Sequence, residues 1–145
     1  MPKINAHESA LKDIFSSDYA FCIPDYQRPY RWEKEQATAL LNDLLAASAG
    51  FEPDREDAKQ SVTPYFLGSC VLIKQEAKPD AEVVDGQQRL TTLSLLFKAI
   101  RDNHADSDIK ASMASRLFEK GNKAEGTKDR VRLRLRERDH AFYEK

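Results

Sequence analysis

The sequence predicts an α/β domain of the α+β kind, with a small mixed sheet and flanking helices. Short apolar runs typical of strands are interspersed with segments in which apolar residues recur at helical spacing. A length of 145 residues suits one domain with a single core. The hydrophobic fraction of 41% and the charged fraction of 32% are those of a globular chain. We therefore expect residues 1–145 to form a single domain.

The first half of the chain contains two helical patterns separated by a strand. Asn5 and Glu8 have the spacing of a capping box, which indicates a helix start. Leucines at helical spacing after Trp32 indicate a longer helix with one apolar stripe. The expected elements are a helix over 5–15, a strand over 19–23, an ordered loop over 24–32 and a helix over 33–48.

The second half predicts a hairpin, two helices and a basic strand. Between residues 130 and 136 arginine alternates with valine or leucine, a pattern typical of a strand with one apolar face. The expected elements are a polar loop over 51–63, a strand region over 65–73, its partner over 82–84, helices over 87–102 and 109–118, a loop over 121–126, a strand over 130–136 and the start of a further element at 140–143.

The cysteines and the apolar runs exclude several classes of protein. Cys22 and Cys70 lie in apolar runs, and neither has a second Cys or His at zinc-ligand spacing, so we expect two buried free thiols. No apolar run is long enough to cross a bilayer, and the N-terminus lacks the apolar core of a signal peptide. We therefore expect a cytoplasmic protein without a membrane partner.

Asp85-Gly86-Gln87-Gln88-Arg89 carries the most information, because it lies between a predicted strand and a predicted helix. The first N–H groups of a helix have no internal partner and attract an anion such as phosphate. Gly86 allows a sharp turn, and Arg89 offers a planar fork for phosphate oxygens. The glutamines can hydrogen-bond a base or ribose, and Asp85 can hold Mg²⁺ or position a water.

A structural interpretation of the same residues stays open. Asp85 as the N-cap, with Gln88 three residues later, is a variant of the capping box that needs no ligand. It does not explain Arg89 in the first turn, where a cation opposes the helix dipole.

Residues 23–32 form a second unusual stretch, in which prolines and aromatic residues surround Arg28 and Arg31. Arginines beside aromatic faces suit a phosphate and a stacked base. The alternative is that Tyr26, Tyr30 and Trp32 anchor the loop to the core, and for these three we favour it. For Gln27 and Arg28 both interpretations stay open.

Basic residues are concentrated between Lys128 and Arg138, although the net charge of the whole chain is −1. Contact with a DNA backbone is one interpretation, and the solvated face of an amphipathic strand is the other, which we favour. The three histidines are scattered and show no metal-ligand spacing.

At these stretches the sequence resembles the N-terminal domain of GmrSD-type, modification-dependent restriction endonucleases, which is related to the ParB/sulfiredoxin-like fold. The family pattern I-P-x-Y-Q-R-x-Y-x-W matches residues 23–32, F-L-G matches 66–68, and D-G-Q-Q-R-L-x-T-L matches 85–93. Asp139 and Phe142 follow the basic strand in the family order.

The resemblance implies a domain that binds and hydrolyses a nucleoside triphosphate with Mg²⁺ in defence against phage DNA. It implies catalytic roles for Asp85, Gln88 and Arg89, with Asp85 as a candidate Mg²⁺ ligand. The residues expected to bind the nucleotide are Gln27, Arg28, Arg31, Gly86, Gln87 and Thr91.

Family members are much longer, and many carry an HNH-type nuclease domain for which this chain has no His-Asn-His cluster. We therefore expect 1–145 to be an incomplete N-terminal portion that does not itself cut DNA. Two other functions stay open: a DNA-binding module, and a non-catalytic scaffold for a nuclease domain or subunit.

Overall fold

The computed structural model describes residues 4–48, 65–136 and 139. Its helices and strands follow the expected order along the chain. They are α1 (Leu11–Ile14), β1 (Ala20–Cys22), α2 (Lys34–Ala47), β2 (Val71–Lys74), β3 (Asp80–Asp85), α4 (Gln87–Asn103), α5 (Ser107–Leu117), β4 (Phe118–Glu119), the 3₁₀ turn η1 (Lys123–Glu125), β5 (Arg130–Val131) and β6 (Leu133–Arg134).

The main sheet has the strand order β2-β3-β1-β6 and is mixed. Strand β1 runs parallel to both neighbours, with Phe21 opposite Ala81 on β3 and opposite Leu133 on β6. Strands β2 and β3 form the predicted antiparallel hairpin. Strands β4 and β5 form a separate two-stranded sheet. A small mixed sheet with flanking helices is therefore confirmed.

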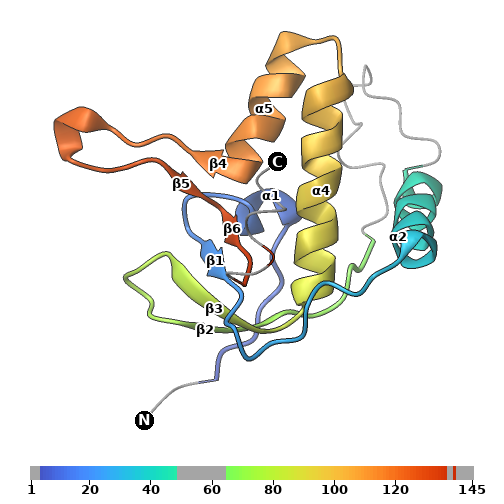
Figure 1. Ribbon diagram of the computed structural model, residues 1–145, viewed down its shortest axis with the longest axis horizontal. Coiled ribbons are helices and arrows are strands. Elements are labelled where there is room, and N and C mark those ends of the chain that lie inside the picture. The colour runs from blue at the N-terminus through green and yellow to red at the C-terminus, as the bar shows by residue number, and fades with distance from the viewer. Residues whose placement is uncertain (1–3, 49–64, 137–138, 140–145) are drawn as a thin grey trace.

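The core lies between the main sheet and helices α1 and α4, while α5 packs beside α4 (Figure 1). Phe15, at the end of α1, contacts Phe21 and Phe97 edge to face. Fully enclosed aromatic rings contribute a large share of the stabilisation of a small core. The buried apolar side chains are Phe15, Phe21, Ile23, Leu40, Ala81, Val83, Leu90, Leu93, Leu133 and Leu135.

The two cysteines are free, but the prediction that both are buried is wrong, because both are exposed. Successive side chains of a strand point to opposite faces of the sheet. On β1 this alternation buries Phe21 and leaves Cys22 on the outer face, and Ile23 beyond the strand is buried again. An apolar run therefore does not bury every one of its members.

The first helix is much shorter than predicted: α1 begins at Leu11, and Asn5 does not cap it. Residues 4–10 are exposed, and Ile4, with 99% of its surface accessible, buries nothing. A short helix without an apolar face to bury is not stable in water. The capping-box spacing of Asn5 and Glu8 is therefore not used as a helix start.

Two further boundaries differ from the prediction. Residues 65–70 are not strand, because Gly68 has a left-handed φ of 106° and the extended backbone starts only at Val71. The basic strand predicted over 130–136 is divided at Arg132 into β5 and β6, which belong to different sheets. The loop predicted over 51–63 and the element predicted at 140–143 lie outside the described residues.

Helix α2 confirms the predicted amphipathic helix with a narrower buried stripe than expected. Leu40 is buried and Leu44 packs against the core, whereas Leu41 and Leu45 are exposed.

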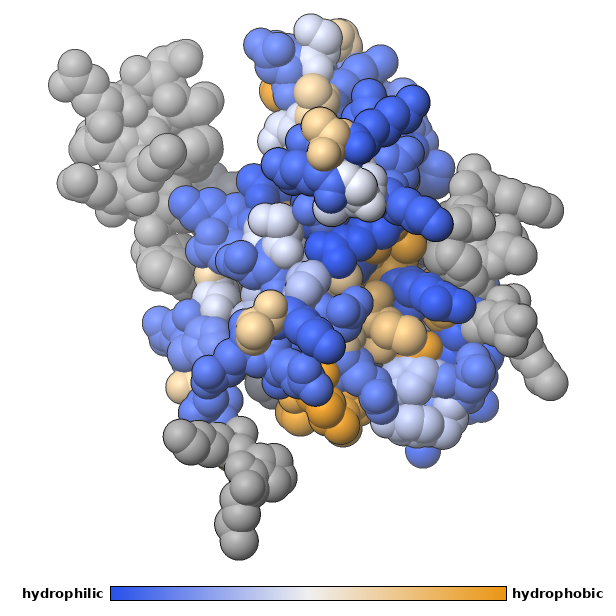
Figure 2. Space-filling view, turned by 90° about the vertical axis from the view of Figure 1, so that its left-hand side faces the viewer, coloured by the Kyte–Doolittle hydropathy of each residue, from blue (hydrophilic) through white to orange (hydrophobic). Residues whose placement is uncertain are grey.

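No helix in the described part of the chain is both long and apolar enough to span a membrane. Figure 2 shows one side of the molecule, which is mainly hydrophilic with an apolar patch at its lower edge.

Candidate functional site

Helix α4 begins directly after β3, at a glycine. Gly86 is the N-cap residue with a left-handed φ of 100°, and no side chain caps the helix. A Cβ at this position would meet the backbone Cα of Cys70 at 3.3 Å, so both the φ angle and the space favour glycine. The alternative interpretation, in which Asp85 caps the helix, is excluded, because Asp85 is still the last residue of β3 and pairs with Val71.

Gln88 fastens residues 24–32 to the first turn of α4. Its Oε1 accepts hydrogen bonds from the backbone N–H of Arg31 at 2.9 Å and of Trp32 at 3.3 Å. Its Nε2 donates to the carbonyl of Pro29 at 3.2 Å. These bonds direct both ends of the amide to the loop, so they account for the adjacent positions of two sequence motifs.

Two other side chains hold the same loop in place. The side chain of Gln27 donates from Nε2 to the backbone carbonyl of Val84 at 3.0 Å. The backbone carbonyl of Gln27 accepts from Nη1 of Arg136 at 3.3 Å. The hydroxyl groups of Tyr30 and Thr92 are 2.9 Å apart and share a hydrogen bond. The loop is thus tied to β3, to α4 and to the residue after Leu135.

Tyr30 and Trp32 are half-buried as the anchoring interpretation expects, but Tyr26 is 71% exposed and is not a core anchor. Its hydroxyl donates to the carboxylate of Glu82 on the outer face of the sheet. This hydrogen bond to a carboxylate raises the pKa of Tyr26 above its usual value of 10.0. Tyr26 therefore holds the loop by a polar contact and not by burial.

A narrow pocket lies beside the first turn of α4 and brings several predicted site residues together. Arg28, Gln87, Gln88 and Thr91 all line it. Its cavity volume of about 10 Å³ is close to the space that one water molecule needs. The complete lining is Ile23, Arg28, Tyr30, Gln87, Gln88, Thr91, Leu135, Arg136 and Asp139.

The polar groups of this pocket differ in whether they are already bonded. Thr91 is buried and donates to the carbonyl of Gln87 at 2.7 Å. Within the described residues, the side chains of Arg28 and Gln87 have no hydrogen bond or ion pair. These two groups, with the uncapped backbone N–H groups of α4, are the donors that remain available to a ligand.

Asp85 and Arg89 do not line the pocket, although the sequence groups them with Gln87 and Gln88. The Arg89 guanidinium lies over Gly68, where an added Cβ would come within 2.1 Å of Nη1. The Asp85 carboxylate is near Cys70, because it is one cause of the raised pKa of that thiol. The five-residue motif is therefore divided between two sides of the helix start.

Arg31 also lies outside the pocket: its backbone N–H bonds to Gln88, and its side chain is exposed.

The structure explains why the F-L-G segment contains a glycine: Gly68 has no side chain and therefore leaves room for the Arg89 guanidinium. In the described part of the chain, no three His, Cys, Asp or Glu residues are grouped as a metal site. Asp85 would offer a bound cation only one carboxylate.

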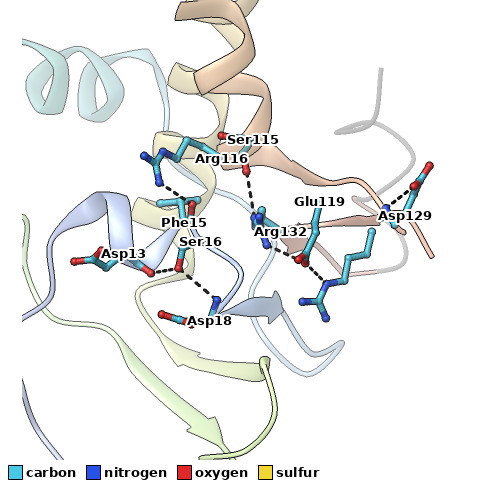
Figure 3. A network of polar contacts seen from close by, with 11 residues as sticks. Asp13, Phe15, Ser16, Asp18, Ser115, Arg116, Glu119, Asp129 and Arg132 are labelled. Carbon is cyan, nitrogen blue, oxygen red and sulfur yellow. Dashed lines mark hydrogen bonds and ion pairs between the residues drawn. The ribbon is translucent and has the colours of Figure 1, made fainter. Parts of the chain in front are cut away.

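Much of the basic segment is paired inside the molecule. Glu119 accepts from Arg130 at 2.7 Å and from Arg132 at 3.0 Å, and Arg132 is buried (Figure 3). Arg136 pairs with Asp139 at 2.8 Å. The favoured interpretation as a solvated strand face is wrong for the buried Arg132. Among the described basic residues of this segment, Lys128 and Arg134 are exposed and make no ion pair.

Arg136 and Asp139 are pocket residues that we did not select as site residues from the sequence. The sequence places Arg136 on the basic face of the predicted strand, because alternation alone explains its position. Asp139 fitted only the family order. The residues around Arg136 give no signal of its place in the pocket, because its bond to Gln27 joins residues 109 positions apart.

A second, wider cavity of about 610 Å³ lies between the outer face of β1 and the β4–β5 hairpin. It is lined by Cys22, Phe118, Val131 and Arg134 among others, and by none of the residues predicted to bind a nucleotide. The motif residues therefore converge on the start of α4 and not on this cavity.

Comparison with known proteins gives a family match for this chain. A search of curated proteins finds no match to this chain. Residues 11–145 match the family model described as the GmrSD restriction endonuclease, N-terminal domain. The match covers every described helix and strand. The chain therefore belongs to the family of GmrSD restriction endonuclease N-terminal domains, and its context is a restriction system that defends against phage.

Proposed function

We propose that this domain binds a nucleoside triphosphate at the start of α4 and hydrolyses it to regulate its restriction system. The observation that carries the proposal is the uncapped helix start that follows Gly86. Beside it lie two cationic side chains and one amide that make no hydrogen bond or ion pair among the described residues. A helix N-terminus with unpaired N–H groups is electropositive and suits phosphate. The three side chains are those of Arg28, Gln87 and Arg89.

The two sides of the helix start suggest how a triphosphate would be held. Arg28 and Gln87 approach from the pocket side, and Arg89 extends from the opposite side over Gly68. A chain of phosphates that crosses the first turn of α4 would contact both sides. Arginine forks bind phosphate oxygens in pairs, which adds geometric specificity to charge attraction.

Hydrolysis would need Asp85 and Mg²⁺ in addition to these groups. Mg²⁺ in nucleotide sites is usually held by one or two carboxylates together with phosphate oxygens and water. The single carboxylate of Asp85 fits that donor set, so the cation would arrive on the triphosphate. Gln88 would act as a positioning residue, because its amide holds the loop that carries Arg28.

A thermal-shift panel of the four ribonucleoside triphosphates with Mg²⁺ tests the proposal. Ligand at 100 times its Kd stabilises the folded state by about 2.7 kcal/mol, which a melting curve detects easily. Arg28→Ala and Arg89→Ala should abolish the shift. Arg134→Ala, which removes an exposed arginine outside the pocket, should keep it. The absence of a shift with all four nucleotides would reject the proposal.

A further inference from the structure

Arg136 is the second arginine of the pocket, and its guanidinium is already occupied. Its Nε donates to Oδ2 of Asp139 at 2.8 Å, and its Nη1 donates to the carbonyl of Gln27. Asp139 is the only carboxylate among the pocket-lining residues that the structure describes. An internal anion therefore holds one of the two cationic groups that face this pocket.

The pocket is too small for a phosphate group, so an anion can enter only if part of the lining moves. A cavity of about 10 Å³ admits one water molecule, whereas sites for small ligands occupy about 300 Å³ or more. Gln88 is tied to the loop by three hydrogen bonds, and Thr91 is buried within α4. These walls are poorly suited to move.

Arg28 is exposed and makes no bond to a described residue, so among the bonded parts of the lining it is the pair of Arg136 and Asp139 that can open. The two side chains are 18% and 30% exposed, so water can replace each partner as the pair separates. One hydrogen bond joins the two side chains, and a second, from the backbone N–H of Asp139 to the carbonyl of Arg136, can stay in place when the side chains separate. A phosphate can take the place of the carboxylate, because both anions match the guanidinium fork.

We propose that Asp139 is a latch: its carboxylate closes the pocket by binding Arg136, and a phosphate group of the ligand displaces it. This inference rests on the proposed function, and it adds a regulatory step to the same site. Arg136 then becomes a ligand-binding residue together with Arg28. The pocket opens only when an anion strong enough to compete with Asp139 is present.

The test compares Asp139→Asn with the unchanged protein by titration calorimetry, using inorganic tripolyphosphate and the nucleotide that gives the largest thermal shift. Removal of the competing charge should raise affinity about fivefold, the factor for a partly exposed ion pair worth about 1 kcal/mol. Asp102→Asn is the matched control, because it removes an equal charge from a pair with Arg101 at the far end of α4. It should leave the affinity unchanged.

The outcomes separate the latch from the function on which it rests. Tighter binding by Asp139→Asn but not by Asp102→Asn supports the latch, as does binding that only Asp139→Asn shows. Equal or weaker binding by Asp139→Asn overturns the latch and leaves the proposed function intact. No binding by any variant overturns both. Asp139→Glu, which keeps the charge, should bind as the unchanged protein does. If Asp139→Asn does not fold, Asp139→Ala removes the same charge and takes its place in this comparison.

Discussion

The adjacent residues Gln87 and Gln88 offer a direct test of how the loop is held, because only one of them is bonded to it. Gln88→Ala removes two hydrogen bonds that the side chain accepts and one that it donates. A hydrogen bond contributes about 0.5–1.5 kcal/mol, and one of the three is exposed to water. Alanine regains about 0.4 kcal/mol in helix propensity. The net loss in the free energy of unfolding should be about 2 kcal/mol.

Urea denaturation followed by circular dichroism measures this loss, provided that the transition is two-state. Gln87→Ala is the matched control, because it removes an identical side chain from the preceding position without breaking a side-chain hydrogen bond to a described residue. Its stability should change by less than about 0.5 kcal/mol. Hydrogen exchange should show faster exchange at the amides of Arg31 and Trp32 in Gln88→Ala only.

Equal losses in the two variants would refute the reasoning, because the loop would then not depend on the amide of Gln88. A loss below about 0.5 kcal/mol for Gln88→Ala would refute it as well. The same two variants also separate the role of Gln88 in holding the loop from the proposed role of Gln87 in binding the nucleotide. Gln87→Ala should weaken the nucleotide-induced thermal shift while the free protein melts normally, since Gln87 is a proposed ligand contact.

Three further predictions concern other parts of the molecule. Ser94→Ala should raise the free energy of unfolding by about 1 kcal/mol in urea, because its buried hydroxyl has no hydrogen-bond partner in the described structure. Glu119→Gln should lower it by about 2 kcal/mol in the same assay, because it leaves the buried Arg132 without its countercharge; an unchanged midpoint would contradict this. Cys70 is exposed as a whole residue, but its thiol lies against Gly86. This local burial, with a second contribution from Asp85, raises the pKa of the Cys70 thiol from 9.0 to about 11. Iodoacetamide should therefore label Cys70 about 100-fold more slowly at pH 8 in the folded than in the urea-unfolded protein, and equal rates would refute the shift.

The sign of the pH effect at Cys70 follows from the same shift. The folded state favours the neutral thiol, so its contribution to stability is complete below pH 9 and is lost as the pH rises from 9 to 11. Stability should therefore fall across that alkaline window, and Cys70→Ser should reduce this part of the fall.

Local patterns predicted the long elements well. The apolar spacing of α4 and α2 and the hairpin of β2 and β3 were all found from residues close in sequence. Helical geometry could also have predicted the division of the motif, since Gln87 and Thr91 share a face while Arg89 lies about 200° away from Gln87.

Contacts between distant residues could not be predicted in this way. The partners of Gln88 lie 56 to 59 positions earlier in the chain, so nothing near Gln88 indicates that its amide is occupied. The division of the basic strand at Arg132 has a similar cause. Its N–H bonds to Leu117, the last residue of α5 before β4, and its carbonyl accepts from Phe21 on β1 of the main sheet.

The central position of β1 has a consequence for how the chain folds during synthesis. Phe21 pairs with Leu133, so the strand made early must wait for about 110 further residues before its second neighbour exists. Pairing across such long separations is slow, because the loop must close before the contact forms. Until then one edge of β1 exposes unpaired N–H and C=O groups, which can recruit a strand from another chain. Nascent chains that stall before residue 133 should therefore be prone to aggregation.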